Sequence, residues 1–147
     1  MTLPKDERRD HYRFAINIPT RWADGDPYGH VNNVIYYSWF DTAVTRMMYG
    51  RGVLQLEGEG AIGLCVESQC AFLAPVSFPQ IVDARVRIGR LGDKSIRYEI
   101  GLFLPERVEP VAVGHFVHVF VDRASRRPTP LSAEHKAALA DLVVELS

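Results

Sequence analysis

The sequence predicts an α+β fold in which an antiparallel sheet covers one long, buried helix. Residues 33–50 carry a double row of apolar side chains at helical spacing, which is wider than the stripe of an ordinary surface helix. Residues 61–122 follow the alternation of long strands joined by short turns. Because an antiparallel sheet needs a cover for its apolar face, we expect this helix to supply it.

The composition is that of one globular domain. The chain has 147 residues, which allows a substantial core, and a formal net charge of −1. This balance gives no reason to expect nucleic acid or an anionic membrane as a partner. Residues 1–10 are rich in charge and lack the apolar run of a signal peptide, so we expect a flexible tail there and a single domain over residues 11–147. No apolar stretch is long enough to cross a bilayer.

The first half of the chain contains one strand, one loop and the long helix. Residues 12–22 alternate in part and predict a strand, and Pro19 favours an edge position because it has no backbone N–H to donate. Residues 24–31 hold three turn-forming Gly and Pro residues and are expected to form a loop. The helix is then predicted over residues 33–50.

The second half predicts strands and a closing helix. A glycine-rich loop over residues 51–60 comes first. Strands are predicted over residues 61–72, 81–90, 95–104 and 111–121, and a final helix over residues 132–147. The last strand is apolar on both faces, which is typical of a central strand.

The cysteines and histidines form no metal-binding pattern. Cys65 and Cys70 are five residues apart and would lie on opposite faces of a regular strand, as would His115 and His118. The chain has no CxxC or HxxxH motif. We therefore expect no metal and no cofactor, and a reducing, cytoplasmic setting is the simplest reading of two cysteines.

The residues that can carry chemistry gather directly before the long helix. This stretch contains Asp24, Asp26 and His30 and ends in Asn32 and Asn33, which can cap the helix. A carboxylate beside the free N–H groups of a helix start could attack a polarised carbonyl or activate water. The alternative is that the aspartates only stabilise the turn through bonds to the backbone.

Residues 24–33 read D-G-D-P-Y-G-H-V-N-N. This motif resembles the D-x-D-x-x-G-H-V-N-N of the hotdog-fold acyl-CoA thioesterases of the 4-hydroxybenzoyl-CoA thioesterase type, and segments 72–75, 92–95 and 117–122 look similar as well. The resemblance implies a hotdog fold, an antiparallel sheet wrapped around a long central α-helix. It also implies a homodimer joined edge to edge, with active sites at the subunit boundary, and in many members a homotetramer.

The resemblance also implies roles for individual residues. Asp26 matches the catalytic carboxylate, which acts either as a nucleophile or as a general base. The backbone N–H of Asn33 matches the donor to the thioester oxygen. His30 would orient the loop or contact the substrate, and Tyr28 and Tyr36 are expected to bind it.

Basic side chains cluster around the hairpin near residue 92. They are Arg85, Arg87, Arg90, Lys94 and Arg97. Lys94 matches a basic position of the family near the nucleotide of coenzyme A, and we expect Arg90 to assist it. Gly92 and Asp93 replace basic residues of the 4-hydroxybenzoyl-CoA enzyme, and a solvated sheet face is the alternative interpretation of the cluster.

The leading hypothesis is an acyl-CoA thioesterase. Asp24 is a rival for the role of Asp26, and Asp41 is a further alternative because some hotdog thioesterases carry their catalytic carboxylate on the central helix. A thioesterase for acyl-carrier proteins and a non-catalytic binder of acyl thioesters remain open. A hotdog dehydratase fits the D-x-D loop poorly.

Overall fold

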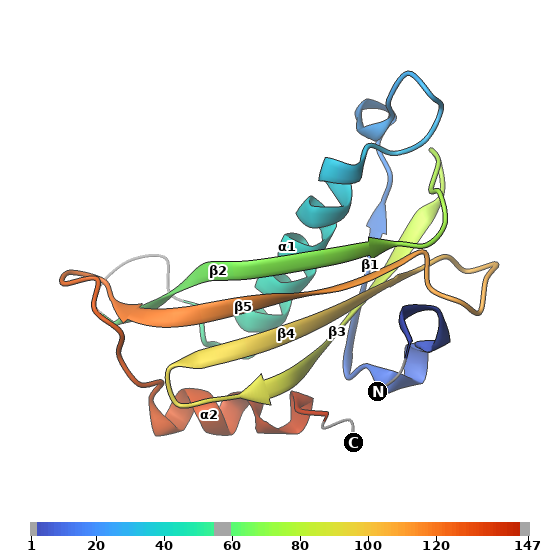
Figure 1. Cartoon of the computed structure of the whole chain (residues 1–147). Helices are drawn as coiled ribbons and strands as arrows, with labels where there is room; N and C mark the ends of the chain where they lie inside the picture. Colours follow the sequence, from blue (N-terminus) through green and yellow to red (C-terminus); the bar gives the residue numbers. More distant parts are fainter. Residues whose placement is uncertain (1–2, 55–59, 145–147) are drawn as a thin grey trace.

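A computed structural model describes residues 3–54 and 60–144 of the chain. The described elements are β1 (Phe14–Pro19), α1 (Asn33–Gly50), β2 (Ala61–Phe72), β3 (Ile81–Leu91), β4 (Ser95–Phe103), β5 (Ala112–Asp122) and α2 (Ala133–Leu139), with short 3₁₀ turns at Pro4–Asp6, Arg9–His11, Trp22–Asp24 and Ala140–Leu142. The strands form one antiparallel sheet in the order β1-β3-β4-β5-β2 (Figure 1). None of the described helices is long and apolar enough to span a membrane.

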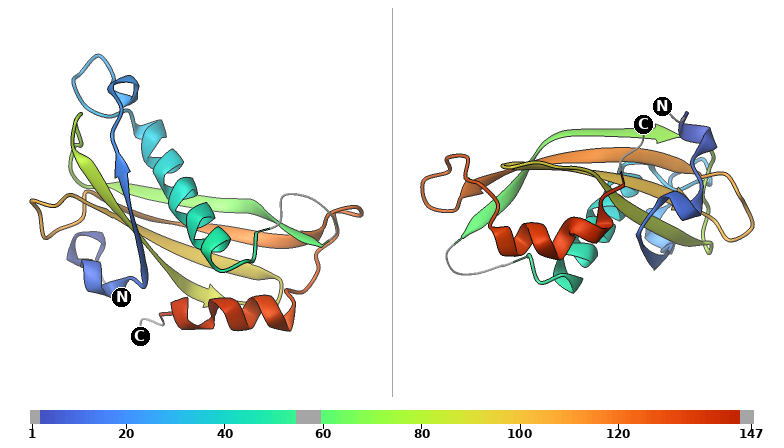
Figure 2. Two further views of the ribbon diagram at one scale, coloured as in Figure 1. Left: turned by 180° about the vertical axis from the view of Figure 1, so that it is seen from behind. Right: turned by 90° about the horizontal axis from the view of Figure 1, so that it is seen from below.

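One face of the sheet packs against α1, which crosses the strands obliquely (Figures 1 and 2). The buried side of α1 consists of Tyr36, Trp39, Phe40, Ala43, Val44, Met47 and Met48. Alternate residues of β3 and β4, such as Val86 and Ile100, are fully buried against it. This arrangement confirms the predicted sheet wrapped around a central helix, which is the hotdog architecture.

A glycine allows α1 to approach β5 closely. A Cβ atom at Gly114 would lie 2.0 Å from the carbonyl oxygen of Gln69 on β2 and 2.6 Å from the ring of Phe40 on α1. No side chain tolerates such contacts without movement of the backbone. The absence of a side chain at this position therefore lets the Phe40 ring fill the centre of the core.

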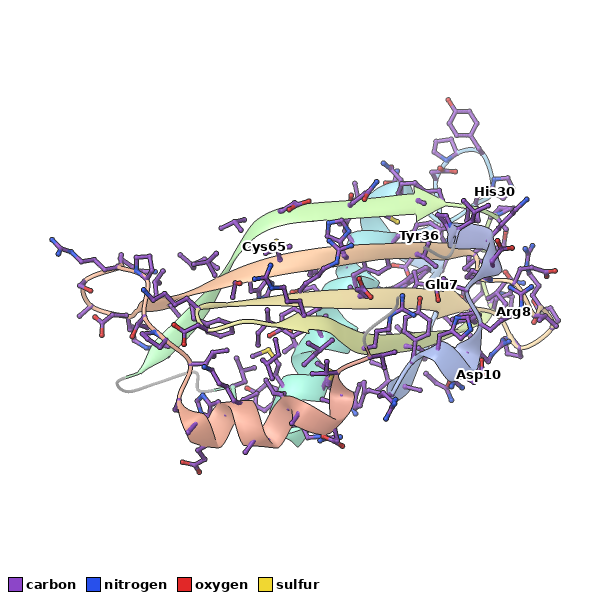
Figure 3. All side chains as sticks on the ribbon, turned by 60° about the horizontal axis from the view of Figure 1, so that its bottom comes forward. Glu7, Arg8, Asp10, His30, Tyr36 and Cys65 are labelled. Carbon is purple, nitrogen blue, oxygen red and sulfur yellow. The ribbon has the colours of Figure 1, made fainter. Side chains whose placement is uncertain are left out.

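The opposite face of the sheet carries an ion-pair network with the N-terminal segment, for which the sequence predicted a flexible tail. Glu7 accepts two hydrogen bonds of 2.9 Å from the guanidinium of Arg87, which also donates to Glu99 at 2.7 Å. Glu7 and Arg87 are both buried, with relative exposures of 5% and 4%. Figure 3 shows Glu7 over the sheet and Arg8 and Asp10 at its margin. Residues 3–11 thus lie against the outer face of β3 and β4.

The two terminal elements are shorter than predicted. β1 is at an edge of the sheet, as Pro19 indicated, but it ends there instead of reaching residue 22. α2 ends at Leu139, and the N–H of Val144 donates to the carbonyl of Ile88 at 2.9 Å. Because β1 pairs with β3 only as far as Val86, the edge of β3 beyond it is free to accept this bond. The predicted loop residues 55–59 and helix residues 145–147 lie outside the described residues.

A β-bulge in β2 corrects the prediction for the cysteines. The register with β5 shifts between Cys65 and Glu67, so that Cys65 pairs with His118 and Cys70 pairs with Gly114. Residues paired directly across two antiparallel strands share a face, and His118 and Gly114 both face α1. Cys65 and Cys70 therefore lie on the same face of the sheet, because the bulge adds one residue between them.

Candidate active site

The loop before α1 is closed on itself by backbone hydrogen bonds. The N–H of Asp26 donates to the carbonyl of His30 at 2.8 Å, and Gly25 forms a bridge with Val31. Gly29, with φ +84°, occupies the left-handed region that favours glycine and donates to the carbonyl of Asp26 at 3.2 Å. These bonds give the loop a defined shape without any regular secondary structure.

The loop is also attached to the segment between β2 and β3. The N–H of Val31 donates to the carbonyl of Val76 at 2.8 Å, and the hydroxyl of Ser77 donates to the carbonyl of Gly29 at 3.2 Å. Two segments distant in sequence therefore form one end of the molecule. Figure 3 shows His30 and Tyr36 at this end, with Cys65 farther along β2.

The two aspartates of the loop have different surroundings. Asp24 is 1% exposed, and its carboxylate accepts hydrogen bonds from the backbone N–H and the guanidinium of Arg21. Asp26 is partly exposed, and its Oδ1 accepts one bond of 2.9 Å from the N–H of Tyr28. Asp26 thus stabilises the turn, which was the alternative interpretation of the sequence, and it also lines a pocket that Asp24 does not line.

The start of α1 presents a backbone donor next to this carboxylate. Asn32 is the N-cap residue, and its side chain accepts the N–H of Val34 at 2.9 Å, while its carbonyl accepts the N–H of Ile35. No acceptor among residues 3–54 and 60–144 bonds the N–H of Asn33. This N–H lies at the positive end of the helix dipole, where a negative charge is stabilised.

A pocket of about 460 Å³ brings the loop and the helix start together. Its lining residues are Asp26, His30, Val31, Asn33, Tyr36, Phe72, Leu73, Ala74 and Pro75. Four of the residues predicted for the site, namely Asp26, His30, Asn33 and Tyr36, therefore share one cavity. Its remaining wall comes from residues 72–75, at the end of β2 and in the turn after it, which look similar to the family but were not predicted to belong to the site.

The aromatic side of the pocket is built around Tyr36. Its ring meets Phe72 at 5.1 Å and Trp39 at 5.2 Å, both edge to face. Burial raises the pKa of the Tyr36 hydroxyl, which stays protonated at neutral pH, although a hydrogen bond from the Val76 backbone opposes part of this rise. The hydroxyl lies 3.4 Å from the carbonyl of Ala74. Tyr36 thus offers an apolar surface and no charge to a bound group.

The other predicted residues lie outside this pocket. Tyr28 is 85% exposed at the tip of the loop. Arg90 and Lys94 are exposed at the far end of the β3–β4 hairpin, and β3 alone spans about 30 Å. Arg87 of the same basic cluster is buried in the ion-pair network on the outer face. Asp41 is exposed on α1, about two turns from the start of the helix, and does not line the pocket.

Other chemistries find less support in the described part of the chain. Burial raises the pKa of the Cys70 thiol to about 12, so this cysteine is not a thiolate nucleophile at neutral pH. No group of three or more His, Cys, Asp or Glu side chains in residues 3–54 and 60–144 is arranged to hold a metal ion. The Asp26 carboxylate is therefore the candidate for nucleophile or base in this pocket.

A sheet wrapped around a central helix defines a hotdog protein, and the pocket lined by Asp26 and Asn33 lies at the start of that helix. The chain belongs to the thioesterase-like superfamily, whose sequence model matches residues 20–139.

Comparison with individual proteins agrees with this assignment. The PA5185 protein of Pseudomonas aeruginosa strain PAO1 is 47% identical, with a TM-score of 0.89 over 95% of this chain and 98% of that protein. The BH1999 gentisyl-coenzyme A thioesterase is 26% identical, with a TM-score of 0.76 over 86% of this chain and 99% of that enzyme. The YsmA protein of Bacillus subtilis (strain 168) is 24% identical over 140 residues, 93% of this chain and 92% of that protein. The superfamily match and the likeness to the gentisyl-coenzyme A thioesterase support thioester hydrolysis.

Proposed function

We propose that this protein is an acyl-CoA thioesterase, which hydrolyses the thioester of an acyl-CoA to a carboxylic acid and free coenzyme A. The observation that carries the proposal is the pocket shared by the Asp26 carboxylate and the unpaired N–H of Asn33. The superfamily membership and the likeness to a gentisyl-coenzyme A thioesterase support a CoA thioester as the substrate.

The proposed chemistry uses these two groups on one carbonyl. The thioester oxygen accepts a hydrogen bond from the N–H of Asn33, which stabilises the negative charge that develops there. Asp26 then acts in one of two ways. It attacks the carbonyl carbon and forms a mixed anhydride that water hydrolyses, or it takes a proton from a water molecule that attacks the same carbon. In both cases the C–S bond breaks and coenzyme A leaves as a thiolate that takes up a proton.

The other pocket residues would bind and orient the substrate. We propose that His30 contacts the thioester region and that Tyr36 packs against the acyl group, because both line the same cavity. Tyr28, at the exposed tip of the loop, would contact the coenzyme A arm. Arg90 and Lys94 are candidates for the phosphoryl groups, and their distance from Asp26 within one chain suggests that they serve the pocket of a second subunit.

The test is thiol release from a panel of acyl-CoAs with short, medium, long and aromatic acyl groups, gentisyl-CoA included. We expect wild type to hydrolyse at least one of them and Asp26→Asn to lower kcat by about 10³-fold or more, because both mechanisms need its carboxylate. The variant should keep its circular dichroism spectrum and melting temperature. Asp41→Asn is the matched control, since it removes an exposed carboxylate outside the pocket.

Three outcomes would contradict the proposal. Turnover that depends on Asp41 instead of Asp26 would move the catalytic carboxylate to the helix. No turnover of any acyl-CoA, but hydrolysis of an acyl-carrier protein, would change the substrate class. Tight binding of acyl-CoA without turnover, unaffected by Asp26→Asn, would identify a non-catalytic binder.

A further inference from the structure

Arg21 and Asp24 form a hydrogen-bonded pair next to the pocket but outside it. The Asp24 carboxylate accepts the backbone N–H of Arg21 at 2.8 Å, its Nε–H at 3.0 Å and an Nη2–H at 2.7 Å. Asp24 is buried, whereas the Arg21 side chain is 71% exposed. All three bonds converge on one carboxylate, so Asp24 has a fixed orientation, and it is not among the residues that line the pocket.

The backbone of Asp24 holds the other end of the loop. Its carbonyl accepts the N–H of Asn32 at 2.9 Å, and Asn32 is the residue that caps α1. Asp24 is therefore held at two points. Its carboxylate is bonded to Arg21, before the loop, and its carbonyl is bonded to Asn32, at which the helix begins. Asp26 lies between these two attachments, and the N–H of Asn33 follows directly after the second.

We propose that Arg21 and Asp24 are positioning residues, which set the distance between the Asp26 carboxylate and the Asn33 N–H without touching the substrate. This inference rests on the proposed function of Asp26 and Asn33. The guanidinium donates two bonds to Oδ1 of Asp24 and the backbone N–H of Arg21 donates to Oδ2, which holds the carboxylate in one geometry as a single point charge would not. Misplacement of reacting groups by about 1 Å costs up to about 10²-fold in rate.

The test compares Asp24→Asn and Arg21→Gln with wild type on the best acyl-CoA substrate. We expect each variant to lower kcat by about 10- to 100-fold and to change KM by less than about threefold, because the pocket wall that binds the acyl group stays in place. Arg21→Lys should recover only part of kcat, since it restores the charge without the fork. The double variant should lose no more than the more affected single variant.

The matched control is Arg51→Gln, at the opposite end of α1. Arg51 forms an ion pair with Asp141 and donates to the carbonyl of Ala138, so its removal also breaks contacts of an arginine. We expect this variant to keep the wild-type kcat. If the Arg21–Asp24 pair contributed only to stability, Arg21→Gln would lower the melting temperature as Arg51→Gln does, and kcat would stay unchanged in both variants.

The dependence of kcat on pH separates positioning from catalysis. The remaining activity of Asp24→Asn should still fall at acidic pH, because Asp26 still supplies the reacting carboxylate. Wild-type kcat in both Arg21→Gln and Asp24→Asn would overturn the proposal. The proposal would also be overturned if kcat of Asp24→Asn no longer fell at acidic pH while Asp26→Asn kept normal turnover, because Asp24 would then be the catalytic group.

Amide hydrogen exchange provides a readout that does not depend on turnover. The N–H of Asn32 should be protected in wild type and exchange faster in Arg21→Gln, because Asp24 loses part of its anchorage. If wild type hydrolyses no thioester, the proposed function fails, and this exchange rate still decides whether the pair holds the helix start. Unchanged protection of Asn32 in Arg21→Gln would contradict the positioning role in either case.

Discussion

Two aspartates separated by one residue show how the surroundings of a side chain decide what it can do. Asp24 is buried and its carboxylate bonds Arg21, whereas Asp26 lines the pocket and keeps one carboxylate oxygen free of bonds to the described residues. Turn preference alone cannot separate the two, because both residues suit a turn. Their difference comes from the 3₁₀ turn Trp22–Asp24, which directs Asp24 back toward Arg21.

Another pair of individual residues, Glu7 and Arg87, leads us to expect that the folded protein loses stability at acidic pH. Burial by itself raises the pKa of Glu7, but the hydrogen bonds from Arg87 and His11 outweigh it, and the pKa lies below its usual value of 4.5. A lowered pKa in the folded state stabilises the protein above the pKa of the unfolded chain. This contribution is lost as the pH falls from about 4.5 through the folded-state value.

We therefore expect Glu7→Gln to lower the free energy of unfolding by about 2 kcal/mol at pH 7, as for a buried hydrogen bond to a charged group. The difference from wild type should shrink below pH 4.5, where wild type loses the same contribution. Urea titrations at pH 7 and at pH 3–5 measure both effects. Glu109→Gln, at an exposed carboxylate, is the control. A difference that stays constant over this range would show that the charge of Glu7 does not act through Arg87.

Among the elements, α1 and β2 have the bounds that the sequence predicted. The bounds of α1, Asn33–Gly50, were predictable because the N-cap asparagine, the apolar rows and the final glycine are all local signals. The shapes of β2 and α2 were not predictable in this way. The bulge at Val66 and the bond between Val144 and Ile88 depend on partners far along the chain.

The candidate site likewise combines residues that are close in sequence with residues that only the fold brings near them. Asp26, His30, Asn33 and Tyr36 lie within about ten residues of each other, so a loop followed by a helix brings them together. The wall at residues 72–75 joins them only because Val76 and Ser77 bond the loop. Arg90 and Lys94 cluster with other basic residues in sequence, but the length of the hairpin separates them from the pocket in one chain.

Gly114 provides a prediction about how α1 is held. An added Cβ would meet the backbone of Gln69 at 2.0 Å, and a backbone atom cannot move aside as the end of a side chain can. We expect Gly114→Ala to lower the free energy of unfolding by about 2–3 kcal/mol or more, which is typical of overpacking in a core. Chemical denaturation followed by circular dichroism measures this change.

Gly50→Ala is the control for this prediction. Gly50 is the last residue of α1, and among the described residues no atom beyond its chain neighbours and the backbone of the helix itself lies within 4 Å of the position of its Cβ. Since alanine is the better helix former, this variant should be as stable as wild type or slightly more so. Equal effects of the two substitutions would contradict the close approach of α1, β5 and β2.

For the whole molecule, the two edges of the sheet differ. β1 has six residues and ends in Pro19, which limits pairing with another strand. β2 has twelve residues and is exposed over most of its length, with Val66 62% exposed. A long, apolar and unpaired edge strand is a surface on which another strand can pair. The edge-to-edge dimer that the family resemblance implied would cover β2 and leave β1 free.

We therefore expect the protein to form a dimer through β2 and Val66→Lys to weaken it, because the variant places two like charges near each other at the edge of the paired strands. Sedimentation velocity over a range of concentrations should show the variant dissociating at concentrations at which wild type stays dimeric. Val108→Lys is the matched control, since Val108 is 61% exposed in the connection between β4 and β5. A monomeric wild type, or equal dissociation of both variants, would exclude β2 as the interface. If the site needs both subunits, kcat per chain should fall together with the dimer fraction in Val66→Lys and stay constant in Val108→Lys.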